Sequence, residues 1–343
     1  MKQKLGFGII GCGAISKWHA EAIATQDDGY LVGVVDYHME CALNFSKSYP
    51  CKVFESVEAL IADPNIDIVC ICTPSGLHAE YAVMAAKAGK HFIVEKPMSI
   101  TKEQIRAVID ACEENLIQGC VISQLRFSPA VQVVRKAIEN GDLGQILVAD
   151  LSMKYHRSSA YYQNSSWRGT WEMDGGGALM NQGIHGIDVL QYLVGPVCSV
   201  GGLCRTLVHD IEVEDTASLT VEYQNGAVGS ITGTTSLPKG SPRLIEINGT
   251  KGRVVLTEDR ITAWEVEDVP MPEIQIDGAD TSSHNAPSRF PVINHAKQIR
   301  DMIEAIKESR RPLVDIYEGK RAVEIILAAY ESSRTGVRVA IEP

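Results

Sequence analysis

The chain has two short segments whose side chains could move a proton, and the first is Glu95-Lys96-Pro97, at the end of an apolar run. An ammonium group at the end of a buried strand is costly unless it pairs or meets a ligand, and desolvation lowers its pKa into a range that suits proton transfer. Lys96 is therefore a candidate catalytic residue. A lysine that pairs with an acid or reaches solvent explains the same pattern equally well.

The second segment is the glycine-rich run 175–188, in which we expect a helix over residues 177–193. Asn181 and His185 are four residues apart, so they share one face of that helix. Histidine is the usual general base near neutral pH, which makes His185 the second catalytic candidate. Asp188 either orients the imidazole or faces solvent. The alternative is a structural histidine with an ordinary surface or capping asparagine.

A glycine-rich turn follows the first predicted strand, residues 5–10. Gly11 permits a tight turn, and Gly13 lets the backbone approach a pyrophosphate at the N-terminus of the next helix. Ser16 occupies the third glycine position of this pattern and is still small. The turn predicts a dinucleotide site that includes Ala14 and Ile15, whereas the alternative is a turn with only a structural role.

Asp36 ends the second predicted strand, 23 residues after Gly13. A carboxylate at this position accepts hydrogen bonds from both ribose hydroxyls and repels a 2′-phosphate. No arginine or lysine follows until Lys47. The sequence therefore favours NAD over NADP, against the alternative of an aspartate that only starts a turn.

The N-terminal part alternates strand and helix patterns, which predicts an α/β Rossmann domain with a parallel, doubly wound sheet. The expected strands are 5–10, 31–36, 51–54, 67–73, 91–96 and 119–123, and the expected helices are 14–25, 39–49, 56–62, 77–88 and 102–115. Ligands bind outside the carboxyl ends of such strands, so the segments after the fourth and fifth strands should face the cofactor.

The rest of the chain predicts an α+β C-terminal domain with a large, mostly antiparallel open sheet. A helix over 128–144 precedes long alternating runs at 145–155, 198–208, 217–226, 227–236, 243–250 and 252–258, and two helices near 292–308 and 316–333 close the chain. Asn225-Gly226 and Asn248-Gly249 indicate hairpins, and polar residues 267–290 indicate a loop. We expect domains at 1–123 and 124–343, with the last helix packing back on the first domain.

Composition limits the partners and the location. The chain has 343 residues and a formal charge of −11, which argues against nucleic acid or an anionic membrane as a partner. The nine cysteines include no C-x-x-C pair, which indicates reduced thiols and no metal site. No segment is typical of a signal peptide or a membrane span. We therefore expect a cytoplasmic protein.

Several segments together resemble the Gfo/Idh/MocA oxidoreductase family. They are GCGAIS, VVD, TPSGLH, VEKP and GGGALMNQGIHGIDVLQYL, and the resemblance continues to PLVDIYEGKRAVEIILAAYESSRTG. It implies NAD or NADP on the first domain. It also implies a homodimer or homotetramer formed through the sheet of the second domain.

The resemblance also implies roles for single residues. Lys96 matches the lysine that hydrogen-bonds the reacting hydroxyl, and His185 matches the acid/base. Asn181 stands where inositol dehydrogenases usually have aspartate. Because asparagine exchanges no proton, proton transfer would fall to His185 and Lys96. The positions implied to contact the cofactor are Thr73, Pro74, Leu77, His78, Glu95, Lys96 and Gln124, and the Lys96–Pro97 peptide is often cis.

A stretch rich in aromatic and arginine residues predicts the substrate pocket. Its candidates are Tyr155, Arg157, Trp167 and Arg168, together with Arg126, Asn181 and His185. Aromatic rings stack on sugars, and arginine binds carboxylate or phosphate through two nitrogens. Packing and surface charge are the alternative. Arg157 with the Asn–His pair is similar to nucleotide-sugar members such as UDP-N-acetylglucosaminuronate 3-dehydrogenases.

These features predict an NAD-dependent dehydrogenase that moves hydride between nicotinamide and a ring hydroxyl of a sugar, polyol or nucleotide sugar. Three alternatives use the same fold. One is a lyase or glycosidase that oxidises the sugar transiently, the second is a non-catalytic protein that senses NAD or a sugar, and the third reduces biliverdin or a dihydrodiol.

Overall fold

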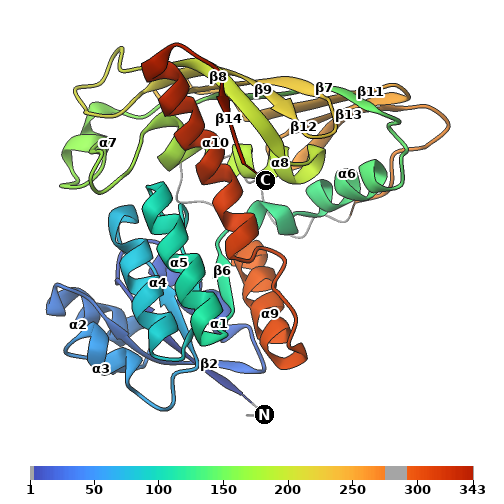
Figure 1. Ribbon diagram of the computed structural model, residues 1–343. Helices are drawn as coiled ribbons and strands as arrows, with labels where there is room; N and C mark the ends of the chain where they lie inside the picture. Colours follow the sequence, from blue (N-terminus) through green and yellow to red (C-terminus); the bar gives the residue numbers. More distant parts are fainter. Residues whose placement is uncertain (1–3, 275–291, 343) are drawn as a thin grey trace. The chain divides into compact units, whose positions relative to one another are not determined.

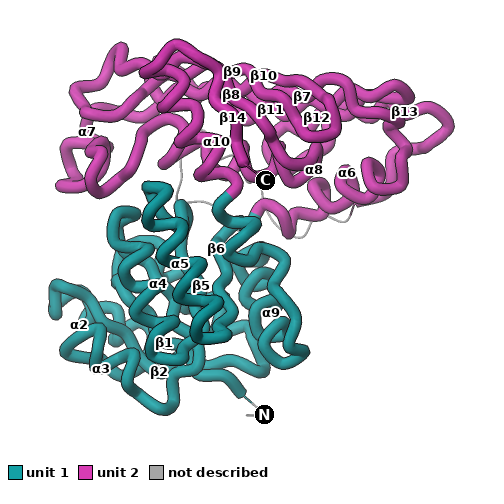
Figure 2. Tube along the Cα trace, in the orientation of Figure 1, with its two compact units in different colours: residues 1–124, 292–320 teal, residues 125–291, 321–343 magenta. Residues whose placement is uncertain are grey.

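The computed structural model describes residues 4–274 and 292–342. The chain folds into two compact units, and each is made of two separate stretches of sequence. Unit 1 comprises residues 1–124 and 292–320, and unit 2 comprises residues 125–291 and 321–343 (Figure 2). Among the described residues, no helix has the length and apolar character needed to cross a membrane.

Unit 1 contains a six-stranded parallel sheet in the order β3-β2-β1-β4-β5-β6. The strands are β1 (Leu5–Ile10), β2 (Gly29–Val35), β3 (Lys52–Val53), β4 (Ile68–Ile71), β5 (His91–Val94) and β6 (Gly119–Val121). Strands β1, β4 and β6 are buried along their whole length because helices cover both faces of the sheet. The predicted Rossmann fold is confirmed.

Helices form the two outer layers of unit 1 (Figure 1). They are α1 (Ser16–Ala24), α2 (Met39–Ser48), α3 (Val57–Ile61), α4 (His78–Lys87) and α5 (Lys102–Asn115). Residues of α1, α2 and α9 (Val292–Glu308) share one apolar cluster with β1 and β4. Thr101 caps α5 by accepting a hydrogen bond from the Gln104 amide, as its position before the helix predicts.

Helix α9 belongs to unit 1, although its sequence position suggested the second domain. Its buried residues Ile299, Met302 and Ile303 pack in the core of the Rossmann sheet. Gln298 hydrogen-bonds the Val121 carbonyl at 2.7 Å and the Ser123 amide at 3.0 Å, so its side chain pairs with edge strand β6 as another strand would. Helix α9 therefore belongs to unit 1 because its apolar face packs against the Rossmann sheet.

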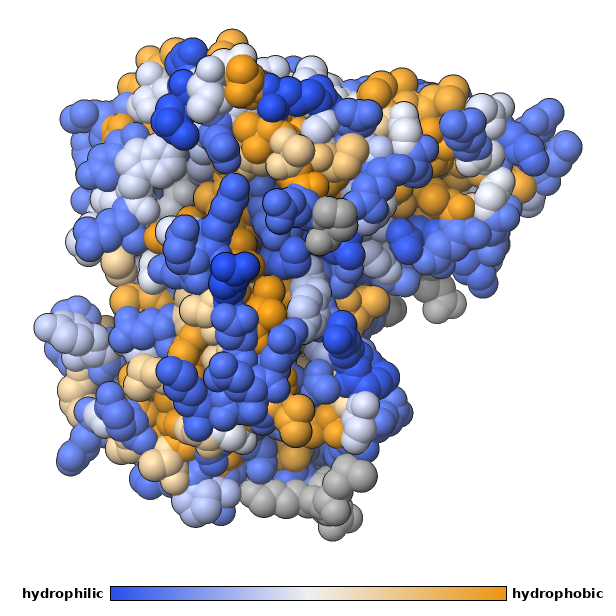
Figure 3. Space-filling model, in the orientation of Figure 1, coloured by the Kyte–Doolittle hydropathy of each residue, from blue (hydrophilic) through white to orange (hydrophobic). Residues whose placement is uncertain are grey.

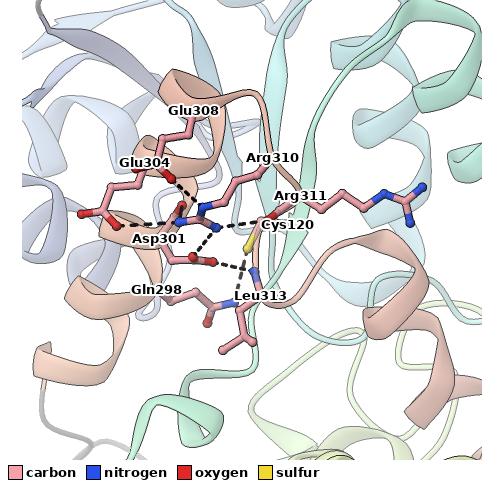
Figure 4. Close-up of polar contacts among 8 residues, drawn as sticks. All are labelled: Cys120, Gln298, Asp301, Glu304, Glu308, Arg310, Arg311 and Leu313. Carbon is pink, nitrogen blue, oxygen red and sulfur yellow. Dashed lines mark hydrogen bonds and ion pairs between the residues drawn. The ribbon is translucent and has the colours of Figure 1, made fainter.

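An ionic cluster holds the turn after α9 (Figure 4). Arg310 contacts Asp301, Glu304 and Glu308 on the helix. The second carboxylate oxygen of Asp301 accepts the Leu313 amide at 2.6 Å. This turn leads to Val314, whose carbonyl accepts the Val121 amide of β6.

Unit 2 contains an eight-stranded sheet in the order β13-β12-β11-β7-β10-β9-β8-β14. The strands are β7 (Ile146–Lys154), β8 (Val197–Arg205), β9 (Thr216–Tyr223), β10 (Val228–Thr234), β11 (Leu244–Gly249), β12 (Gly252–Thr257), β13 (Arg260–Val266) and β14 (Val339–Ala340). All neighbours are antiparallel except β7 and β10, which confirms the mostly antiparallel sheet.

The remaining elements of unit 2 are helical. They include most of the 3₁₀ turn η2 (Gln124–Phe127), α6 (Pro129–Glu139), α7 (Ser159–Gln163), a π-helix η3 (Ala178–Gly183), α8 (Ile184–Val194) and the later part of α10 (Ile316–Thr335). Helix α8 packs on β7 and β11, and α6 packs on α8. Helix α7, strand β13 and the two-residue strand β14 were not predicted from the sequence. The loop predicted at 267–290 lies mostly outside the described residues.

The two predicted hairpins differ in their turns. Gly226 has φ +86° and donates its amide to the Tyr223 carbonyl, so Asn225-Gly226 forms the β9–β10 turn as predicted. Asn248 and Gly249 instead end strand β11, and Thr250 and Lys251 make the turn to β12. The prediction placed this hairpin correctly but assigned the wrong residues to its turn.

Candidate functional site

The glycine turn of unit 1 follows β1 closely. Gly11 has φ +93°, and a Cβ added to it would lie 2.6 Å from the Cys72 carbonyl oxygen. A Cβ added to Gly13 would meet no atom within 4 Å. The Ser16 hydroxyl donates to the Gly13 carbonyl at 2.6 Å and braces the turn. Gly11 is thus required by close packing, whereas Gly13 borders open space that can admit a phosphate.

Asp36 is anchored to this turn. One carboxylate oxygen accepts the Cys12 amide at 2.7 Å, and the other accepts the His38 amide at 2.8 Å. The side chain is half-buried, and each oxygen keeps a further lone pair. This geometry presents a fixed acceptor pair beside the glycine turn.

The ends of β4 and β5 are tied together by buried side chains. Both ring nitrogens of His78 lie against carbonyl oxygens, Pro97 at 2.6 Å and Thr73 at 2.8 Å. Because its polar atoms are used in this way, His78 braces the two strand ends and has none left for a cofactor. Lys96 is half-buried, and the Lys96–Pro97 peptide is cis.

Glu95 is buried and holds two partners. Its Oε1 atom lies 2.9 Å from Nε2 of His19 on α1, and its Oε2 accepts the Lys96 amide at 3.3 Å. Burial works to raise the pKa of Glu95, but the hydrogen bond and charge of His19 lower it to about 2. Glu95 therefore links helix α1 to the backbone of Lys96.

Two buried polar atoms at this edge of unit 1 have no hydrogen-bond partner among the described residues. They are Oγ1 of Thr73 and Oε1 of Gln124, which follow β4 and β6. Buried polar atoms are rarely left unpaired, so both fit a site that a polar ligand completes. Together with the open space at Gly13, they are consistent with a dinucleotide running along this edge.

In unit 2, the segment with Asn181 and His185 is not the uniform α-helix that the sequence predicted. It begins as the π-helix η3 and becomes α8 at Ile184. Both side chains are half-buried. The Asn181 amide donates to the Asp174 carboxylate, and its own oxygen accepts from Gln182 at 2.7 Å.

Gln182 joins this segment to the predicted substrate residues. Its Oε1 accepts from Nε and Nη2 of Arg157 at 3.1 and 2.6 Å, and its amide donates to the Tyr161 hydroxyl at 2.8 Å. The Arg168 guanidinium lies 4.4 Å from the Tyr161 ring centre and 5.3 Å from that of Trp167. Two arginines therefore meet around Tyr161. Burial lowers the pKa of Arg157.

Arg126 does not belong to this group. It is fully buried, and its Nε and Nη2 atoms bind the two carboxylate oxygens of Asp188 at 2.9 and 2.6 Å. Asp188 therefore pairs with Arg126 and is buried, so the alternative in which it faces solvent is wrong. Tyr155 is also buried, beside Arg157. A completely covered guanidinium with a bidentate partner has a structural role, so we remove Arg126 from the substrate contacts.

Comparison with known proteins matches both units. Residues 5–122 match the oxidoreductase family NAD-binding Rossmann fold of Gfo/Idh/MocA proteins, and residues 135–341 match the C-terminal alpha/beta domain of the same family. The chain belongs to the Gfo/Idh/MocA oxidoreductase family. The expectation of an NAD-dependent dehydrogenase acting on CH–OH groups is thereby confirmed, and the lyase and sensor alternatives are not favoured.

Named relatives of this Gfo/Idh/MocA protein act on sugars and polyols. Levoglucosan dehydrogenase of Pseudarthrobacter phenanthrenivorans is 30% identical over 291 residues, 75% of each chain. Inositol 2-dehydrogenase of Rhizobium meliloti is 28% identical over 267 residues, 76% of this chain and 78% of the relative. The WlbA dehydrogenase of Bordetella pertussis, solved with NADH and UDP-GlcNAcA, aligns with a TM-score of 0.89 at 34% identity and 99% coverage of both chains.

Sequence reasoning missed three polar residues that hold candidate residues within the two units of this Gfo/Idh/MocA chain. They are His19, Asp174 and Gln182, which hold Glu95, Asn181 and Arg157 respectively. Gln182 is adjacent to Asn181 in the analysed motif, so its position was a usable signal. His19 and Asp174 are joined to their partners only by the fold.

Proposed function

We propose that this protein oxidises a ring hydroxyl of a sugar derivative. His185 takes the hydroxyl proton, and Lys96 hydrogen-bonds the same oxygen and stabilises its developing negative charge. NAD, when bound, accepts the hydride from that carbon. Asn181 exchanges no proton, and its contacts with Asp174 and Gln182 support a role in holding the helix start beside His185.

We propose that the protein prefers NAD to NADP. The geometry of Asp36 carries this proposal, because both carboxylate oxygens are fixed by backbone amides next to the glycine turn. A rigid negative charge there favours two ribose hydroxyls and opposes a 2′-phosphate. The cofactor contacts proposed with it are Gly11, Gly13, Ala14, Ile15, Thr73, Pro74, Leu77 and Gln124.

We propose that the substrate carries an anionic group, and that a nucleotide-linked uronic acid is the first compound to test. Arg168 is held against Tyr161 and Trp167, and its buried Nε atom has no hydrogen-bond partner among the described residues. A guanidinium with a donor to spare suits a carboxylate or phosphate. The 34% identity to a dehydrogenase solved with UDP-GlcNAcA supports the same class.

The decisive test is NAD reduction with a panel of polyols, aldoses, uronates and nucleotide sugars, followed at the nicotinamide absorbance. NADH should accumulate with an anionic sugar derivative, and Lys96→Ala should lose turnover while its NAD affinity stays unchanged. Arg168→Ala should raise the KM of an anionic substrate and leave that of a neutral one unaltered. Turnover restricted to neutral polyols would reject the anionic substrate class.

We propose that two or four copies assemble through the sheet of unit 2. Val148 and Val228 are neighbours on β7 and β10, and both are more than one-third exposed, as are Leu203 and Leu244. Apolar surface is visible on unit 2 in the view of Figure 3. Exposed apolar residues on an open sheet are typical of an interface. Val228→Asp should shift the mass measured by light scattering toward the monomer. We also propose a cytoplasmic location, supported by nine free cysteines among the described residues.

A further inference from the structure

Three glycines precede η3, and two of them are explained by close contacts. A Cβ added to Gly177 would lie 2.0 Å from the Glu214 carbonyl oxygen. A Cβ added to Gly176, which has φ +154°, would lie 2.0 Å from the Tyr330 hydroxyl. The glycine run therefore lets Glu214 and Tyr330 approach the backbone at the start of this helix.

Glu214 alone binds the three amides that open η3. Its carboxylate accepts the Gly177 amide at 3.0 Å and the Leu179 amide at 2.7 Å, and its backbone carbonyl accepts the Ala178 amide at 2.9 Å. The first amides of a helix have no partner within it, so a buried helix start needs such acceptors. Glu214 is itself only 3% exposed, which leaves water little access to the same amides.

The segment that Glu214 holds carries the proposed chemistry of unit 2. Asn181 lies two residues after Leu179, and its backbone N–H donates to the Gly177 carbonyl at 3.0 Å. The side chain of Gln182 binds Arg157, and its backbone N–H also donates to the Gly177 carbonyl, at 3.3 Å. His185 lies in the first turn of α8, which continues from η3. A shift at residue 177 would therefore move every one of these side chains.

We infer that Glu214 is a positioning residue, which fixes the register of η3 and thereby the placement of Asn181, Gln182 and His185. This inference rests on the proposed function for its catalytic consequence. Glu214 belongs to unit 2, whereas the NAD-binding fold spans residues 5–122, so cofactor affinity should not depend on it.

The test compares Glu214→Gln with the wild type. Glutamine keeps the size of the side chain but replaces one acceptor oxygen by an amide that cannot accept an N–H. We expect kcat per NADH-binding site to fall about 10- to 100-fold, as small misplacements of catalytic groups do. NADH affinity should stay within about twofold, because that site lies in unit 1. Glu267→Gln, an exposed residue on the same unit, is the matched control and should keep wild-type kcat.

Amide hydrogen exchange of peptides covering residues 175–185 gives a readout that needs no turnover. Exchange should be faster in Glu214→Gln than in either the wild type or Glu267→Gln. Unchanged exchange would refute the role of Glu214 in holding the amides at the start of η3. Faster exchange with unchanged kcat per site would refute the positioning role. If Glu214→Gln does not fold, Glu214→Asp, whose carboxylate is one methylene too short to reach both amides, is measured instead with the same expectations.

Failure of the proposed function would look different. The wild type would then reduce no NAD with any sugar. The exchange comparison would still test whether Glu214 holds the amides at the start of η3. A wild type that turns over and a variant that matches it in both kcat and exchange would overturn the inference about Glu214 alone.

Discussion

The Nε2 atom of His19 lies 2.9 Å from Oε1 of Glu95 in the interior of unit 1. Burial works to lower the pKa of His19, but the sulfur atoms of Cys72 and Cys70 and the Glu95 carboxylate raise it well above its ordinary value. The carboxyl pKa of Glu95 is lowered at the same time. The two side chains thus form a buried ion pair that joins helix α1 to Glu95, the residue before Lys96.

This pair makes a prediction for His19→Gln, which keeps a donor and removes the charge. Because the folded pKa of His19 is raised above 6.5, its stabilisation is complete below that pH and is lost as pH rises through the folded value. We expect the variant to be destabilised by about 3 kcal/mol near pH 6 and by less near pH 9. Urea unfolding across this range measures the difference. A pH-independent difference would contradict the charged pair.

Asp36→Asn should weaken NAD selectivity. Removing the charge weakens the hydrogen bonds to the ribose hydroxyls and removes the repulsion of a 2′-phosphate, so kcat/KM with NAD should fall by about tenfold. The ratio of NAD to NADP efficiency should fall further, by about 100-fold. Steady-state kinetics with both cofactors measures this ratio, and Asp27→Asn, an exposed carboxylate of unit 1, is the control. An unchanged ratio would show that Asp36 does not select the cofactor.

Asp188→Asn should destabilise unit 2 without affecting substrate binding. It leaves the buried Arg126 guanidinium without its countercharge, which costs about 3 to 5 kcal/mol. Arg126→Met combined with Asp188→Leu should recover much of that loss, because no buried charge remains. Denaturant unfolding gives the stabilities. Substrate KM per folded molecule should match the wild type in the double variant, and a large rise would return Arg126 to the substrate site.

The stability of unit 2 should fall as Glu214 ionises. Burial raises the pKa of its carboxyl from 4.5 to about 7, so the folded state binds the proton more tightly than the unfolded chain. Stability from this group is complete below about pH 4.5 and is lost as pH rises to about 7, a loss of roughly 3 kcal/mol. Titratable groups near it include Tyr330 and Cys204, and the pKa values of both are themselves raised by burial.

Thermal or urea unfolding of the wild type and Glu214→Gln from pH 4.5 to pH 7 tests this prediction. The stability of the wild type relative to the variant should decline across that interval. Parallel curves would mean that Glu214 titrates as an exposed glutamate does.

The sequence predicted the architecture well because strand ends carry strong local signals. Gly11, Asp36, Thr73 and Lys96 lie at or just after the carboxyl ends of strands in one parallel sheet. Such positions are fixed by topology alone, so apolar runs and turn residues are enough to find them.

Contacts between residues far apart in the sequence could not be predicted from local patterns. The spacing of Asn181 and His185 indicated an α-helix, but Glu214, 35 residues after Leu179, binds its first amides, and the segment starts as a π-helix. Likewise the pairing of Arg126 with Asp188 spans 62 residues. Neither partner leaves a local pattern that would identify the other.

The chain passes between the two units three times, after residues 124, 291 and 320. A fragment that stops at residue 124 would lack α9 and expose the backbone of β6 that Gln298 covers. Chimeras that exchange cofactor preference among relatives must therefore transplant residues 292–320 along with the first 124. A single crossover would join an incomplete Rossmann unit to a foreign helix, and such hybrids should aggregate at the uncovered strand edge.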